Sequence, residues 1–252
     1  MQTIRRDFLP EHLRAEIAAV GVDGVVSVQA RQSIHETGWL LDLAARNGFI
    51  RGVVGWVDLV SPTVGAQLER FSACPKLKAV RHVVQGEPDD NFILRNDFNR
   101  GIRELKKVSL AYEILIFERH LPQTVQFVDA HPNQVFVLDH IAKPRIKDDG
   151  FDRWERPFRE LARRENVFCK VSGMVTEADY ASWTEPQLHR YFETALEAFT
   201  PRRLMFGSDW PVCLVACGYA RWHTIVSNWI SACSPDEQAR ILGGTAVAAY
   251  SL

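Results

Sequence analysis

Cysteine is scarce in this chain. The 252 residues include five cysteines, an odd number scattered along the sequence: Cys74, Cys169, Cys213, Cys217 and Cys233. Small secreted folds held by disulfides need paired cysteines at close spacing, so this class is excluded. The one close pair, Cys213 and Cys217, lacks both zinc-finger spacing and a second pair. We therefore expect a protein of the reducing cytoplasm.

Charge imbalance and long apolar runs are also absent. Thirty Lys and Arg residues face 31 Asp and Glu residues, a formal net charge of −1, so no overall field attracts nucleic acid or an anionic membrane. No apolar run reaches the ~18 residues of a membrane span, and the first residues are charged where a signal peptide has its apolar core. We expect neither nucleic acid nor membrane as a partner.

Two catalytic and binding motifs are missing. No GxGxxG turn follows the first predicted strand, which removes the usual mark of a doubly wound dinucleotide-binding sheet. No serine stands in a GxSxG elbow, so a serine hydrolase of that type is excluded.

The sequence does contain apolar, β-branched runs of strand length. They show no alternation of polar and apolar residues, which indicates strands buried on both faces of a parallel sheet. These runs cover residues 24–29, 52–57, 77–84, 111–117, 135–139, 167–172 and 204–209.

Helical patterns separate the strands. Apolar residues recur there at spacings of three and four, often after a Pro, Ser or Asp start signal. The predicted helices cover residues 11–20, 34–47, 64–74, 91–107, 123–130, 151–165 and 187–198. The alternation of predicted strands and helices along the chain predicts an α/β protein with a parallel sheet. No linker divides the chain, so we expect one domain over residues 1–252.

The number of strands favours an incomplete barrel. A (β/α)₈ TIM barrel has eight strands, each followed by a helix, whereas this sequence has seven and begins with a helix. The missing element would be the first β-strand, before residues 11–20. An open doubly wound sheet is the competing fold.

In a parallel barrel the catalytic groups stand at the carboxyl ends of the strands. Asp209 ends the last run, LMFGSD, where a buried carboxylate must be paired or bound to a metal, unless it caps a helix. His140 and Lys143 follow VFVLD, and an imidazole there can ligate a metal or move a proton. Asp139 is the better candidate for an orienting residue.

A third strand end, VRHVVQ, carries Arg81, His82 and Gln85. Because side chains alternate along a strand, we expect only one of Arg81 and His82 to face the barrel mouth. Lys170, in FCKVSG, is predicted either to bind an anionic or carbonyl oxygen or to form a surface ion pair.

Seven ordered segments resemble the amidohydrolase-2 group of metal-dependent hydrolases, and within it the sugar-lactone lactonases. The tail ILGGTAVAAYSL is similar to the terminal helix of that family. The matching segments are TIRRDFLPEHL, GVDGVVSVQA, FIRGVVGWVDL, AVRHVVQGEPD, VFVLDHIAKP, FCKVSGMVTEAD and RLMFGSDWPV.

The resemblance implies a barrel that opens lactones such as L-fuconolactone, L-rhamnonolactone or related carboxylated lactones. It implies catalytic roles for His140 and Asp209, which are also the candidate metal ligands. It further implies that five residues line the substrate site: Arg81, His82, Gln85, Lys143 and Trp210.

One departure from the family is large. Its members open with a strand ending in His-x-His, which supplies half of a divalent metal site, and no such motif precedes Arg5 here. Only His140 and Asp209 remain as ligands, while a catalytic zinc usually takes three protein groups and a water. A start assigned too late, a deletion that lost the metal, and a metal-independent mechanism all explain this.

We expect Asp209 to activate water for ring opening, with a divalent cation, zinc foremost, as cofactor if one binds. Decarboxylation or cyclic-amide hydrolysis is the rival reaction. A third hypothesis is an inactive, truncated barrel kept as a scaffold. A second copy of the chain sealing the open seam would make a homodimer.

Overall fold

Seven parallel strands form one curved sheet in the computed structural model, which describes residues 2–71 and 73–252. The strands are hydrogen-bonded in their sequence order from β1 to β7. Their bounds are β1 Val25–Val28, β2 Ile50–Gly55, β3 Leu77–His82, β4 Ala111–Ile114, β5 Phe136–Leu138, β6 Val167–Val171 and β7 Leu204–Phe206. This is a half-barrel, an incomplete version of the predicted (β/α)₈ fold, and not a doubly wound sheet.

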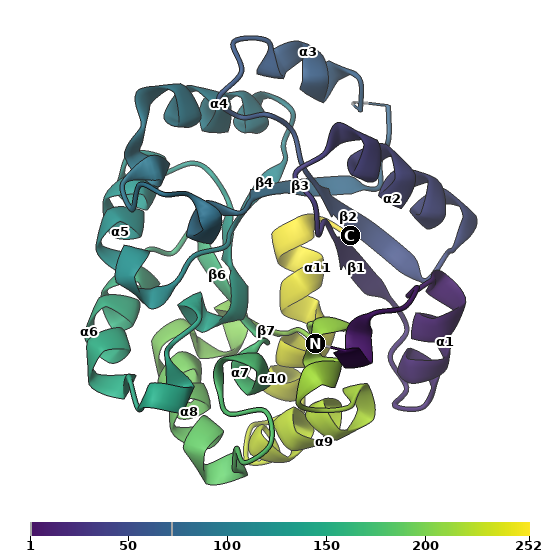
Figure 1. Cartoon of the computed structure of the whole chain (residues 1–252), viewed down its shortest axis with the longest axis vertical. Coiled ribbons are helices and arrows are strands. Elements are labelled where there is room, and N and C mark those ends of the chain that lie inside the picture. The colour runs from purple at the N-terminus through teal and green to yellow at the C-terminus, as the bar shows by residue number, and fades with distance from the viewer. Residues whose placement is uncertain (1, 72) are drawn as a thin grey trace.

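Helices cover the convex outer side of this sheet (Figure 1). Their apolar faces explain the packing: in α4, Phe98, Ile102 and Leu105 recur at spacings of four and three and are all fully buried. The helices in this layer are α2 Ile34–Arg46, α3 Val64–Glu69, α4 Asn96–Lys107, α5 Leu121–Asp129, α6 Phe151–Ala162 and α8 Glu185–Arg203. The remaining helices are α1 Pro10–Ala18, α7 Met174–Glu177, α9 Tyr219–Trp229, α10 Pro235–Ala239 and α11 Thr245–Tyr250.

The last helix, α11, lies on the concave inner side of the sheet (Figure 1). Its Ala249 and Tyr250 share a buried cluster with inward-facing strand residues, namely Val54, Ala79, Ala111, Val137 and Met205. These apolar contacts remove the concave surface from water, where an open half-barrel would otherwise expose it. The buried side of α11 is thus part of the interior of the half-barrel.

All seven predicted strands and all seven predicted helices are present, with differences at their ends. The second strand begins at Ile50, two residues before its predicted start, and the helix predicted from residue 91 begins at Asn96 after a short 3-10 turn. Three helices, α7, α9 and α10, have no counterpart in the sequence prediction, while α11 lies in the tail that resembles the family's terminal helix. Within residues 2–71 and 73–252, no helix is long and apolar enough to cross a membrane.

Candidate active site at the carboxyl ends of the strands

His140, Ser172 and Asp209 meet where β5, β6 and β7 end. The His140 Nε2 atom lies 3.8 Å from the Asp209 Oδ1 atom. Its other ring nitrogen, Nδ1, is 2.8 Å from the hydroxyl oxygen of Ser172. The His140 and Asp209 side chains are 11% and 16% exposed, so both remain reachable from the mouth. Burial lowers the pKa of His140, with the nearby Asp209 carboxylate acting against this, so the ring is neutral at pH 7.

The backbone that carries these residues is strained. Four consecutive residues after β5, from His140 to Lys143, have φ between 49° and 62°, and Asp209 has a φ of 54°. Residues with a Cβ atom seldom adopt this left-handed conformation, which costs roughly 1–2 kcal/mol per residue. The indole of Trp154 holds the turn by donating a 2.7 Å hydrogen bond to the carbonyl of Ile141. Strain of this kind gathers at functional sites.

Two glycines leave room for the site. A Cβ atom on Gly173, which has a φ of 65°, would lie 2.8 Å from the ring of His140. A Cβ atom on Gly207 would lie 2.9 Å from the Cβ atom of Ser172. Both distances are too short for a side chain, so glycine at these two strand ends permits the close approach of β5, β6 and β7.

A buried ion network lies next to His140 on the concave side of the sheet. Asp139 accepts from Arg81 at 2.8 Å and from the Lys170 Nζ atom at 2.8 Å. Lys170 also contacts the Glu113 Oε1 atom at 2.6 Å, and the hydroxyl of Tyr250 donates to that same oxygen. The network therefore connects β3, β4, β5 and β6 with the terminal helix α11.

The charges in this network hold one another in place. Burial alone would raise the pKa of Asp139, but Lys170 and Arg81 outweigh it and hold the pKa well below its ordinary value. Burial raises the pKa of Glu113, and the Asp139 carboxylate adds to the effect. Removing one partner from such a network would leave a buried charge without compensation, which typically costs 3–5 kcal/mol.

Arg81 and His82 point in different directions, as strand alternation predicts. Arg81 crosses the concave side to Asp139 and to the Oε1 atom of Gln29, 2.9 Å away. His82 packs on the other side, and both of its ring nitrogens are occupied. Trp56 donates to its Nδ1 atom at 3.4 Å, and its Nε2 atom lies 2.7 Å from Glu87. His82 is thus held within the protein and faces away from Asp139.

Lys143 and Glu177 form an ion pair near His140 and Asp209, at the carboxyl ends of the strands. The Lys143 Nζ atom lies 3.3 Å from the Glu177 Oε1 atom and 5.7 Å from the centre of the Phe117 ring. The two side chains are 18% and 19% exposed. Burial raises the pKa of Glu177, Lys143 lowers it, and the carboxylate of Asp209 raises it again. Glu177 therefore belongs to the same electrostatic environment as Asp209.

Gln85 and Trp210 each present a buried polar atom without a hydrogen-bond partner among the described residues, the Oε1 atom of Gln85 and the Nε1 atom of Trp210. The Trp210 ring packs edge-on against Phe8, with ring centres 5.1 Å apart. Buried polar atoms are usually satisfied. Both groups are therefore free to bond to water or to a ligand.

The donor set for a metal is small. Across residues 2–71 and 73–252, no three His, Cys, Asp or Glu side chains come together as a metal site would require. His140 and Asp209 supply two donors, whereas a catalytic zinc takes three protein ligands and a water. The described residues do not fit a resident catalytic zinc.

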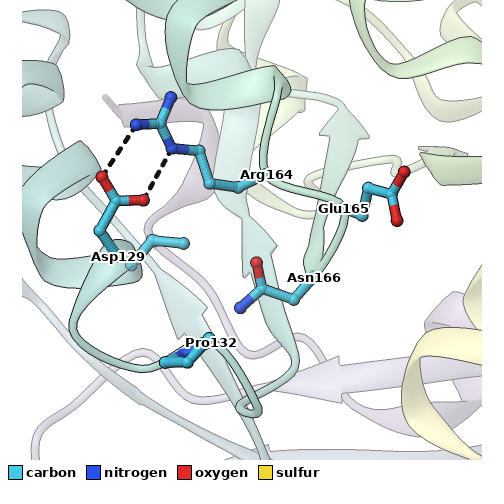
Figure 2. A pocket seen from close by; sticks show the side chains of 6 residues that line it. Asp129, Pro132, Arg164, Glu165 and Asn166 are labelled. Carbon is cyan, nitrogen blue, oxygen red and sulfur yellow. Dashed lines mark hydrogen bonds and ion pairs between the residues drawn. The ribbon is translucent and has the colours of Figure 1, made fainter.

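One pocket lies at the opposite end of the sheet, where the strands begin. Its volume is about 420 Å³, and it is lined by Val128, Asp129, Pro132, Arg164, Glu165 and Asn166. Figure 2 shows the two-pronged ion pair between Asp129 and Arg164 at its wall. Asp129 and Arg164 are thus already paired with each other. The pocket holds neither His140 nor Asp209, so we place the candidate site at the strand ends.

Sequence patterns alone miss two groups of this site, Glu177 and Ser172, and give only weak evidence for Glu113. Glu177 lies on α7, whose four residues are too few for a helical period. Ser172 follows β6 as an ordinary small polar residue. Glu113 stands inside an apolar strand, and that isolated charge is the one signal that could have revealed the buried network. Of the two alternatives for Lys170, the surface ion pair is wrong, because its partners Glu113 and Asp139 are fully buried and the lysine contacts their anionic oxygens.

Comparison with known proteins was made over the whole chain. The amidohydrolase family model matches residues 2–252. An L-fucono-1,5-lactonase of Burkholderia multivorans is 39% identical, with 100% of this chain and 88% of the relative covered. An L-fucono-1,5-lactonase of Burkholderia ambifaria is 34% identical with the same coverage. A crystal structure of a Burkholderia multivorans amidohydrolase with bound zinc has a TM-score of 0.96 at 38% identity, covering 100% of this chain and 91% of that one.

Proposed function

Because this chain belongs to the amidohydrolase family, we propose that it hydrolyses the ester bond of a small sugar lactone. The observation that carries the proposal is the approach of His140 and Asp209 to 3.8 Å on strained turns at adjoining strand ends. Two relatives at 34% and 39% identity across the whole chain are L-fucono-1,5-lactonases. A ring of the L-fuconolactone or L-rhamnonolactone type is the substrate we propose.

Asp209 is the general base of the proposed reaction. Its carboxylate takes a proton from a water molecule, and the water oxygen attacks the lactone carbonyl carbon. The ring C–O bond then breaks as the tetrahedral intermediate collapses. Asp209 returns its proton to the departing alkoxide, which becomes the free hydroxyl of the product acid.

His140 is the electrophilic partner. We assign the tautomer with its proton on Nε2, the nitrogen that faces Asp209, so that the hydroxyl of Ser172 donates to the Nδ1 atom 2.8 Å away. That N–H group donates to the carbonyl oxygen of the lactone as negative charge develops there. Trp210 and Gln85 supply further polar atoms for the substrate.

Replacement of Asp209 by Asn tests this function. The amide keeps the shape of the side chain but cannot accept the proton, so we expect hydrolysis of L-fuconolactone to fall by 10²-fold or more. The expected melting temperature is that of the wild-type protein. Turnover at the wild-type rate in a folded variant would refute the assignment.

Two further points belong to this proposal. Amidohydrolases are typically metal-dependent and a relative binds zinc, but the described donors of this chain number two, so the steps above use its own side chains. We also propose a cytoplasmic site of action, which fits five cysteines that are all free.

A further inference from the structure

The Lys143–Glu177 pair lies beside the proposed catalytic residues without a part in the reaction steps. Its two side chains are about one-fifth exposed, and they present an ammonium donor next to a carboxylate acceptor. Lys143 belongs to the same strained turn as His140. Glu177 follows Gly173 by four residues, and the backbone of Gly173 lies against the His140 ring. The pair is therefore fixed to the reaction centre from two sides.

The charge around this pair disfavours an anionic substrate. The two cations that act on His140 are Lys143 and Arg81, and each is already matched by a carboxylate, Glu177 and Asp139 respectively. Asp209 adds a carboxylate whose ion-pair partner among the described residues is His140 alone.

The adjoining rim is acidic as well. Glu118, whose carboxylate also acts on Glu177, lines a pocket of about 380 Å³ together with Asp148, Asp149, Asp152, Arg145 and Arg153. Two of these acids are already paired, Asp148 with Arg145 and Asp149 with Arg190. A lactone carrying carboxylate groups would meet like charge at Glu177 and Asp209, while a neutral ring would not.

We propose that Glu177 determines substrate specificity: with Lys143 it binds adjacent hydroxyl groups of a neutral lactone, and it excludes carboxylated lactones. A diol offers one oxygen to the ammonium group and one O–H to the carboxylate, so both members of the pair stay satisfied when substrate replaces water. This inference rests on the proposed lactone hydrolysis and adds the residue that selects among lactones.

Three substrates separate recognition from chemistry: L-fuconolactone, δ-valerolactone, which has no hydroxyl groups, and 2-pyrone-4,6-dicarboxylate. In Glu177→Gln we expect the KM for L-fuconolactone to rise roughly tenfold or more, the effect of losing a hydrogen bond to a charged group, with kcat nearly unchanged. The kcat/KM for δ-valerolactone should stay within about twofold, and that for the dicarboxylate should increase. Lys143→Met should show the same selective loss on L-fuconolactone.

Glu104→Gln is the matched control. In the wild-type protein, the Glu104 Oε1 atom lies 2.7 Å from the Lys107 Nζ atom, so this variant also removes a Lys–Glu pair. The pair is on the last turns of α4, just before β4 begins, and therefore lies at the end of the sheet opposite to the proposed site. We expect no change with any of the three substrates. Equal losses on L-fuconolactone and δ-valerolactone in Glu177→Gln would overturn the specificity role while leaving lactone hydrolysis intact.

If the wild-type protein hydrolyses none of the three, the proposed function fails, and binding decides the inference. L-fucose carries the same ring hydroxyls, and its affinity can be measured by NMR titration without catalysis. Weaker binding to Glu177→Gln than to the wild type and to Glu104→Gln supports hydroxyl recognition by Glu177. Equal affinities overturn it.

Discussion

The hydroxyl of Ser172 lies 2.8 Å from the Nδ1 atom of His140 and so leaves the Nε2 atom of the same ring directed toward Asp209. Ser172 itself is buried, at 1% exposure, and makes no other side-chain hydrogen bond given by the structure. It therefore fixes the orientation of the histidine ring, and in the proposed mechanism its O–H group donates to the Nδ1 atom. It has this effect without touching the proposed reacting atoms.

Replacing Ser172 by Ala should slow the reaction with little loss of folding. Without the hydroxyl, the His140 ring loses the contact that orients its Nε2 atom, and a hydrogen bond of about 1 kcal/mol is lost. We expect kcat on L-fuconolactone to fall about fivefold to tenfold, with KM unchanged. A parallel Ser182→Ala variant, which removes a surface hydroxyl bonded to Asp179, should match the wild type, and a similar loss there would contradict the role of Ser172.

Gly173→Ala should displace His140. The added Cβ atom would lie 2.8 Å from the ring, and the φ of 65° disfavours alanine. We expect at least a tenfold loss of kcat/KM and a melting temperature several degrees lower. Gly38→Ala in α2, where no atom lies within 4 Å of the new Cβ, should be neutral or stabilising. Normal activity in Gly173→Ala would show that the histidine tolerates a different position.

Tyr250→Phe should destabilise the protein. The phenol donates to the fully buried Glu113, whose Oε2 atom has no hydrogen-bond partner among the described residues. Losing this bond costs about 1–3 kcal/mol, or roughly 2–10 °C in melting temperature for a chain of this size. Thermal unfolding followed by circular dichroism measures the shift. Tyr180, which is 44% exposed, provides the control, and an equal shift in Tyr180→Phe would argue against the buried contact.

Removal of metal should leave activity unchanged. His140 and Asp209 supply two ligands among the described residues, fewer than a catalytic zinc needs. After dialysis against a chelator, we expect mass spectrometry to find far less than one zinc ion per chain, with lactone hydrolysis within about twofold of the untreated protein. Stoichiometric zinc that survives dialysis, or activity that returns only with zinc, would contradict this.

Stability should fall as the pH drops below the ordinary histidine range. Burial lowers the pKa of His140, so between that lowered value and 6.5 the unfolded chain binds more protons than the folded chain. The free energy of unfolding therefore increases with pH in this window, and the protein becomes less stable as the pH decreases through it. Denaturant titrations between pH 5 and 7.5 should therefore give a shallower slope for His140→Asn than for the wild type. Identical slopes would assign the effect to other groups.

The strands and most helices could be predicted because their signal is local. Apolar runs of four to six residues define buried parallel strands, and a polar residue directly after such a run, as with Asp209 and His140, marks a strand end. The bounds differ by a few residues, since hydrogen bonding and not composition ends a strand. At the site, the alternation of side chains along a strand correctly predicts that Arg81 and His82 point to opposite sides of the sheet.

The remaining features depend on contacts between distant segments. Nothing local in the sequence says that Tyr250 lies against Glu113, 137 residues away, or that α11 packs on the concave side of the sheet. Glu177 was missed because its helix has only four residues, and its partner Lys143 comes from another loop. Charges that pair across strands cannot be read from spacing within one strand.

The position of α11 also orders the events of folding. The charged residues of β3 to β6 are synthesised before the phenol that contacts Glu113, because α11 follows every strand of the sheet in the chain. The apolar concave surface stays open to solvent until Tyr250 and Ala249 dock on it. Closure of this contact across 137 residues is slow compared with local helix formation. The nascent half-barrel therefore exposes its inner face, and depends on protection from aggregation, until its last turn of helix is in place.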